Sequence, residues 1–166
     1  RGVNHGPDMG EAVLSSGTVA AAMEGLALGV PAIAFSFAGS VLRADALLDD
    51  HVGTMERILR HITDLPVFPE STLFNVNIPP VAADQLEGFR LTRLGRRAYS
   101  DSLTRMKDPW GRPIYWIGGG SVDWKDSAAD SDFQAIADGY VSITPLHLDL
   151  THRAVLDSAE PWLRPR

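Results

Sequence analysis

The sequence contains no cysteine, which excludes a disulfide framework, a thiolate metal site and a cysteine nucleophile. It also lacks any apolar run of the ~18 residues that a membrane-spanning helix needs, so we expect no membrane partner. Positive charge is scarce, because 15 Lys and Arg stand against 21 Asp and Glu and leave a net charge of −6. This balance gives no electrostatic reason to bind nucleic-acid duplexes, which are polyanions. Without a recognisable signal peptide, we expect a cytoplasmic protein.

Two common catalytic motifs are also absent. The five histidines show no His-Glu-x-x-His spacing, and no Gly-x-x-x-x-Gly-Lys-Ser/Thr phosphate loop occurs. The composition is otherwise ordinary for a globular protein, with 45% hydrophobic and 22% charged residues. A chain of 166 residues can bury a sizeable core, and we expect residues 1–166 to form a single domain.

Alternating strand and helix patterns predict an α/β fold. Serine caps, a terminating glycine and apolar residues spaced three and four apart identify the helices, and short apolar runs identify the strands. The expected elements are a helix from Ser16 to Gly29, a strand over 32–37, a helix over 42–63, strands over 73–78 and 140–146, and a short helix near 154–163. This order is typical of a layered fold with a largely parallel sheet.

Residues 88–118 have a different character and are interpreted as an extended β arm. Basic residues dominate the stretch from Arg90 to Lys107, where Asp101 is the only acid. Residues 108–111 have turn chemistry, and a β-rich run with adjacent aromatic residues follows. Aromatic residues and arginine are enriched at the cores of protein interfaces, so the arm is a candidate interaction surface.

Ser16, Gly17 and Thr18 open the first expected helix and form a candidate phosphate cradle. A helix N-terminus offers free backbone N–H groups and the positive end of the helix dipole, both of which attract anions. The two hydroxyls add donors, and the glycine allows close approach of a ligand. The same tripeptide, taken alone, is more often a simple helix cap, because serine and threonine are preferred N-cap residues.

Asn4 and Asp8 lie on a glycine-rich loop over residues 2–10, just before that helix. An asparagine carbonyl and an aspartate carboxylate are hard oxygen ligands suited to Mg²⁺ or Mn²⁺. Both residue types also serve turn geometry, and the local pattern taken alone favours that interpretation.

Together these stretches resemble the SurE (survival protein E) nucleotidase family. The segments that carry the resemblance are 2–10, 16–25, 75–79, 92–97, 108–118, 132–133 and 139–146. Their order and spacing agree over essentially the whole chain. The resemblance implies a Rossmann-like α/β fold with a mostly parallel sheet and a protruding β-hairpin arm. It also implies a 5′/3′-nucleotidase that hydrolyses nucleoside monophosphates with a divalent metal, and polyphosphate is a further substrate class.

The resemblance also implies roles for particular residues. Asn4 corresponds to a ligand of one divalent metal ion, Mg²⁺ or Mn²⁺, while Ser16, Gly17 and Thr18 correspond to the phosphate-binding segment. Asp8 occupies a position near the phosphate where the family usually has asparagine, although a carboxylate there would repel a phosphate. No catalytic residue is identified beyond these metal and phosphate groups.

The resemblance further implies assembly and a missing part of the site. The arm over 88–118 corresponds to a hairpin used in oligomerisation, which predicts a homodimer or homotetramer. The family's Asn-Asp-Asp-Gly segment, which holds its acidic metal ligands, does not occur, and Asp49-Asp50 lies in a helical pattern. We therefore expect a C-terminal portion, incomplete in its N-terminal strands, that is inactive alone because one amide cannot hold Mg²⁺. The alternative is a non-catalytic module that binds phosphate or nucleotides, or that only oligomerises.

Overall fold

A five-stranded sheet forms the centre of the computed structural model, which describes residues 3–39, 49–64, 68–98, 103–117, 123–124 and 128–159. Its strands, in spatial order, are β1 (Asn4–His5), β2 (Ala32–Phe37), β3 (Leu73–Ile78), β9 (Tyr140–Leu146) and β4 (Gly88–Leu91). Three of the four pairings are parallel, and only β3 with β9 is antiparallel. The predicted α/β fold with a mostly parallel sheet is therefore confirmed.

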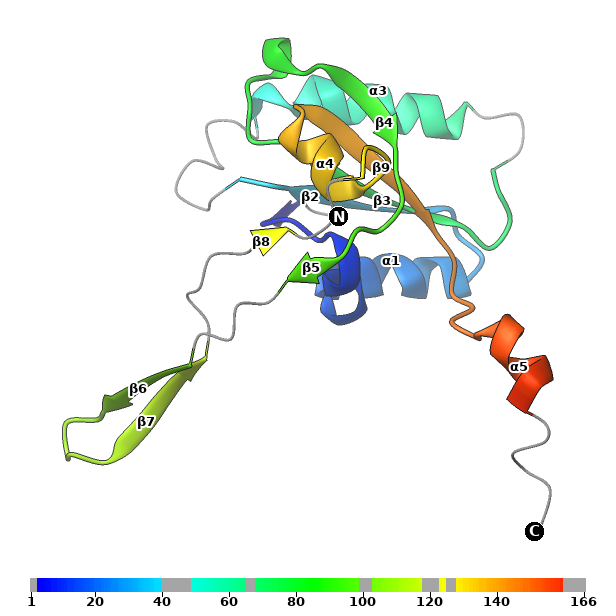
Figure 1. Ribbon diagram of the computed structural model, residues 1–166. Helices are drawn as coiled ribbons and strands as arrows, with labels where there is room; N and C mark the ends of the chain where they lie inside the picture. Colours follow the sequence, from blue (N-terminus) through cyan, green and yellow to red (C-terminus); the bar gives the residue numbers. More distant parts are fainter. Residues whose placement is uncertain are drawn as a thin grey trace.

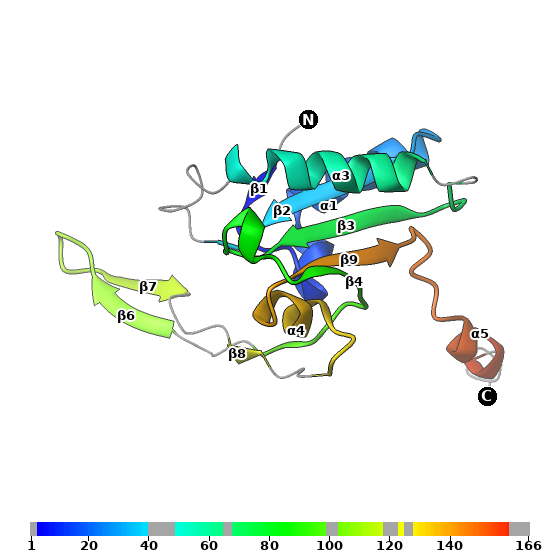
Figure 2. The ribbon, with the colours of Figure 1, turned by 90° about the horizontal axis from the view of Figure 1, so that it is seen from above.

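Helices α1 (Gly17–Ala27) and α3 (Val52–Thr63) cover opposite faces of this sheet (Figures 1 and 2). Alternate residues of β2 and β3 point to the two sides, as the period of a strand requires. One core packs the sheet against α3 and contains Phe35, Phe37, Ile58, Ile62, Phe74, Val76, Ile78 and Val141. The other packs it against α1 and contains Val13, Val19, Ala22, Ala32, Ala34 and Leu73.

Most predicted elements occur where the sequence places them. The strands over 32–37, 73–78 and 140–146 are confirmed residue for residue. Helix α3 fills the second half of the helix predicted over 42–63, and residues 40–48 lie outside the described part of the chain. Helix α5 (Arg153–Ala159) falls in the predicted C-terminal helix, whose residues 160–163 also lie outside it.

Five short elements are not predicted by the hydrophobic pattern. They are β1, the 3₁₀ helices η1 (Gly10–Ser15) and η2 (Ala83–Gln85), α4 (Asp132–Ala137) and β8 (Asp123–Trp124). Each has six residues or fewer, which is too short to show a period. None of the helices in the described ranges is both long and apolar enough to span a bilayer.

The arm is shorter than predicted. Strands β6 (Leu103–Lys107) and β7 (Pro113–Ile117) form an antiparallel hairpin that projects from the body (Figure 1). At its base, β5 (Arg97–Ala98) pairs with β8 (Asp123–Trp124). The first residues of the predicted arm, 88–91, belong instead to the main sheet as β4. The reason is that β9 offers them a parallel partner strand from Gly88↔Tyr140 to Leu91↔Ile143.

Candidate functional site

The candidate site lies where the parallel strands β1, β2 and β3 end. Open α/β sheets bind ligands at the carboxyl ends of their strands. Asn4 of β1 is opposite Ser36 of β2, and Ser36 is opposite Asn77 of β3, so three polar side chains share one row across the sheet. Asp8, on the loop that follows β1, bonds to all three of them.

The backbone of Asp8 is fixed by two buried asparagines of β3. Its N–H donates to Oδ1 of Asn77 at 3.0 Å. Its carbonyl oxygen accepts from Nδ2 of Asn75 at 2.8 Å and from Nδ2 of Asn77 at 3.0 Å. Because both asparagines are fully buried, these bonds are shielded from water and hold the loop firmly against the sheet.

The carboxylate of Asp8 orients Asn4. Oδ2 of Asp8 accepts one hydrogen bond from Nδ2 of Asn4 and one from Oγ of Ser36, both at 3.1 Å. Nδ2 of Asn4 also donates to the carbonyl oxygen of Gly6 at 3.0 Å. Both amide hydrogens of Asn4 are thereby used, and within the described residues its oxygen Oδ1 accepts no hydrogen bond. That oxygen is free to bind a cation.

The donor set fits Mg²⁺ or Mn²⁺ in kind but not in number. The amide oxygen of Asn4 and the second carboxylate oxygen of Asp8 are hard ligands of the type these ions prefer. Mg²⁺ takes six ligands in an octahedral arrangement, so these two oxygens supply only part of its shell. Elsewhere in the described ranges, no group of three or more His, Asp or Glu side chains could hold a metal ion. Asn4 and Asp8 could therefore supply only part of the ligands of such an ion, and the predicted role of Asn4 stays a prediction.

The predicted phosphate cradle sits at the start of α1. Oγ of Ser16 accepts a hydrogen bond from the Val19 amide at 3.1 Å, so Ser16 is a helix cap, as the local pattern favours. The amides of Gly17 and Thr18 make no hydrogen bond to any described residue. Apart from its chain neighbours and the backbone of its own helix, no described atom lies within 4 Å of the place where a side chain at Gly17 would begin. Among the described contacts these two N–H groups at the helix start are unpaired, which is an arrangement that suits an anion.

A hollow of about 570 Å³ is lined both by a candidate metal ligand and by a residue of the candidate phosphate cradle. Asn4 lines it from β1 and Thr18 from α1, and residues 32–35 of β2 line it as well. Ser16, Gly17 and Asp8 do not line it, and the described contacts of Asp8 join it to the strands rather than to the cradle. Its predicted place beside a phosphate stays a prediction.

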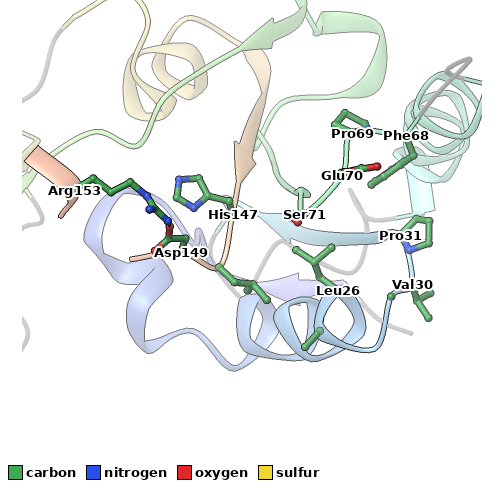
Figure 3. A pocket seen from close by; sticks show the side chains of 13 residues that line it. Leu26, Val30, Pro31, Phe68, Pro69, Glu70, Ser71, His147, Asp149 and Arg153 are labelled. Atoms are coloured by element: carbon green, nitrogen blue, oxygen red, sulfur yellow. The ribbon is translucent and has the colours of Figure 1, made fainter. Parts of the chain in front are cut away.

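A larger hollow of about 1050 Å³ lies at the opposite edge, where β2 and β3 begin and β9 ends (Figure 3). Figure 3 shows Arg153 beside Asp149 at one side of this hollow, with Phe68 and Glu70 across from them. None of the predicted site residues lines it, so volume alone does not identify the functional site.

Sequence reasoning missed the residues that support the site. Asn75 and Asn77 alternate with apolar residues on β3, and buried asparagines need hydrogen-bond partners, so their spacing was a usable signal. Ser36 gave no such signal, because it stands alone in an apolar run, and the polar residues around Asp132 do not indicate that its carboxylate is buried. Asp132 is fully buried, and its carboxylate accepts a hydrogen bond from the Gly10 amide at 2.8 Å.

Known proteins are similar to this chain over most of its length. A curated 5′-nucleotidase SurE from Gemmatimonas aurantiaca is 68% identical over 161 residues, which are 97% of this chain and 64% of that protein. The crystal structure of the SurE protein from Aquifex aeolicus has a TM-score of 0.82 at 37% identity, covering 98% of this chain and 64% of that one. The chain thus spans about 64% of the length of each relative. Residues 1–101 match the family described as survival protein SurE, and the chain belongs to that family.

Proposed function

We propose that the protein carrying this chain is a 5′/3′-nucleotidase that hydrolyses nucleoside monophosphates with one divalent metal ion, Mg²⁺ or Mn²⁺. The observation that carries the proposal is the shared hollow, which Asn4 borders from the sheet and Thr18 from the start of α1. A cation-binding oxygen and an anion-binding helix start on one hollow suit a phosphate monoester. The 68% identical relative carries the name 5′-nucleotidase SurE, which supports the same reaction class.

In this mechanism the chain binds and orients the phosphate. The amides of Gly17 and Thr18, with the Thr18 hydroxyl, hold phosphoryl oxygens and stabilise the charge that develops on them. Asp8 and Gly6 accept the hydrogen bonds of the Asn4 amide group, which leaves its oxygen to bind the metal. When bound, the metal would lower the pKa of a water and neutralise phosphoryl charge. We place the reaction in the cytoplasm and include polyphosphate as a second substrate class.

We also propose that these 166 residues are inactive alone, because Asn4 and Asp8 supply too few oxygens for a complete metal shell. The test measures phosphate released from AMP, GMP and polyphosphate, with Mg²⁺, with Mn²⁺ and with a chelator. The chain is compared with a chimera to which the remaining part of the Gemmatimonas protein is joined. We expect metal-dependent release from the chimera only. Nucleotide binding without phosphate release by the chimera would favour the non-catalytic alternative, and activity of the chain alone would require another metal site.

The arm is the proposed surface for a homodimer or homotetramer. Met106, Ile114 and Trp116 alternate onto one face of the hairpin, and their exposed fractions are 49%, 44% and 64%. An isolated two-stranded hairpin is marginally stable in water, so an apolar face of this kind gains from packing against the same face of a second copy. Size-exclusion chromatography with light scattering measures the assembly directly.

A further inference from the structure

Three segments that are distant in sequence meet at the buried carboxylate of Asp132. Oδ2 accepts a hydrogen bond from the Gly10 amide at 2.8 Å. Oδ1 accepts one from the Gly95 amide and one from the Phe133 amide, both at 2.9 Å. Asp132 is fully buried at the start of α4, so all three bonds are shielded from solvent. Hydrogen bonds from backbone amides to an ionised carboxylate are among the stronger ones in proteins.

The two glycines at this junction have no room for a side chain. A Cβ on Gly10 would lie 2.6 Å from the carbonyl oxygen of Gly95 and 2.9 Å from the ring of Phe133. A Cβ on Gly95 would lie 2.5 Å from the same ring and 2.9 Å from Oδ1 of Asp132. Gly10 also has a φ of +54°, which favours glycine. The backbones therefore touch, and Asp132 with Phe133 fills the space around them.

Gly10 lies between the two groups of candidate site residues in the chain. Asp8 and Asn4 precede it, and η1 connects it to Ser16 at the start of α1. Fixing the Gly10 amide therefore fixes the spacing between the cation side of the site and the phosphate side. Gly95 stands between β4 and β5, at the base of the arm. The one carboxylate thus holds the site loop and the arm base together.

We propose that Asp132 is a positioning residue that sets the distance between Asn4 and the cradle at Gly17 and Thr18, and that joins this site to the arm base. The proposal rests on the proposed phosphatase function for its consequence, although the contacts stand without it. Asp132 acts through Gly10 and touches no substrate. Misplacing reacting groups by about 1 Å can cost ~100-fold in rate, so a single lost bond at Gly10 is enough to matter.

The Asp132→Asn variant separates the hydrogen bond to Gly10 from the hydrogen bond to Gly95. The asparagine oxygen replaces Oδ1, which holds two amides, Gly95 and Phe133. Its NH₂ group then faces the Gly10 amide, where two donors meet and no hydrogen bond forms. The variant should release the site loop and keep the arm base. The matched control is Asp130→Asn, which removes a neighbouring exposed carboxylate whose side chain pairs only with Arg93 among the contacts seen.

Amide hydrogen exchange, measured by NMR on the chain, tests the contacts without any activity. In the wild type, the amides of Gly10, which opens the short helix η1, and Gly95, which lies in a loop, should both exchange slowly. Fast exchange at either would overturn the proposal. In Asp132→Asn, we expect at least tenfold faster exchange at Gly10 and unchanged exchange at Gly95. Equal loss at both, or no loss at Gly10, contradicts the assigned role.

Kinetics in the active chimera test the consequence. We expect Asp132→Asn to lower kcat for AMP by 10- to 100-fold with a smaller change in KM, because binding groups remain while their spacing is lost. Asp130→Asn should match the wild type. Faster exchange at Gly10 with unchanged kcat would make Asp132 merely structural and refute the positioning role. A wild-type chimera without phosphatase activity would refute the proposed function instead, and the exchange pattern would still decide the contacts.

Discussion

The side-chain amide of Asn4 donates to the carboxylate of Asp8 over 3.1 Å, and this bond decides which way the Asn4 oxygen points. Asp8 is therefore expected to act on the metal through Asn4. Supporting partners of metal ligands typically contribute 10- to 100-fold in affinity, so Asp8→Ala should weaken Mn²⁺ binding by about that factor. Isothermal titration calorimetry on the chimera measures it.

A second variant, Asp8→Asn, distinguishes an orienting role of Asp8 from direct binding of the metal. An asparagine oxygen can still accept hydrogen bonds from Asn4 and Ser36, so the orientation of Asn4 should survive. The same change removes a negative charge near the proposed phosphate, and KM for AMP should fall. If Asp8→Asn weakens Mn²⁺ binding as much as Asp8→Ala, then Asp8 is itself a ligand and its orienting role is secondary.

Gly17→Ala probes the cradle without disturbing the fold. Apart from its chain neighbours and the backbone of its own helix, no described atom lies within 4 Å of the new methyl group, and alanine has a higher helix propensity than glycine. The chain should therefore be as stable or more stable, while the methyl group enters the space assigned to phosphate and raises KM for AMP. Gly53→Ala in α3, whose new methyl group likewise meets no described atom within 4 Å beyond its neighbours and its own helix backbone, is the control and should leave KM unchanged. An unchanged KM for Gly17→Ala would place the phosphate elsewhere.

Ser16 and Thr18 should separate stability from activity. Ser16→Ala removes a cap bond to Val19, which typically costs about 1 kcal/mol of unfolding free energy. Thr18→Ala breaks no described hydrogen bond, yet loss of a preorganised donor typically costs ~2.7–4 kcal/mol in the transition state. We expect chemical denaturation to detect the first change and kcat/KM to detect the second. Ser16→Thr retains a hydroxyl and should keep the cap. Unchanged kcat/KM in both alanine variants would leave Ser16 as a cap only.

The arm prediction can be tested with adjacent residues on opposite faces. Trp116 shares its face with Met106 and Ile114, whereas Tyr115 lies opposite Arg105 on the other face. Trp116→Lys should therefore shift the protein to a smaller species in size-exclusion chromatography with light scattering. Tyr115→Lys, at a similarly exposed aromatic position, should leave the mass unchanged. If both variants or neither change the mass, the apolar face is not the interface.

The fold was predictable wherever local patterns determine structure. Strands β2 and β3 are buried on both sides and therefore appear as continuous short runs, and Ser16 and Gly29 mark the ends of the first helix. Strand β4 was not placed correctly, because the alternation around Phe89 suits a hairpin and a sheet edge equally well. Only its pairing with β9, about fifty residues later, decides between them.

The candidate site residues come from local motifs, whereas the contacts between them could not be predicted from the sequence. Asn4, Gly17 and Thr18 come from short motifs that the sequence displays directly. The hydrogen bond from the Gly10 amide to Asp132 joins residues 122 positions apart, and no local sequence pattern predicts it. The segments around Gly10, Gly95 and Asp132 all contribute to the family resemblance, and the structure gives a physical reason, because they meet at one point.

The last prediction concerns the pH dependence of stability. Burial raises the pKa of the Asp132 carboxyl, although the amides of Gly10, Gly95 and Phe133 partly oppose the rise. Between the ordinary aspartate value of about 3.9 and the raised folded value, the folded state binds more protons than the unfolded state. The stabilisation of the folded state by proton binding at Asp132 is therefore fully present below that pH window. It is lost as pH rises through the window.

The difference in unfolding free energy between wild type and Asp132→Asn isolates this contribution. It should fall as pH rises through the window, with a slope of at most about 1.4 kcal/mol per pH unit for one proton. Asp138 supplies a control of opposite sign, because hydrogen bonds from Arg90 and Gln134 lower the pKa of its carboxyl. The difference between wild type and Asp138→Asn should rise with pH over the acidic range. Urea unfolding from pH 3 to pH 8 measures both. A flat or rising difference for Asp132→Asn would mean that the amide bonds outweigh burial, so that the carboxylate is held ionised throughout.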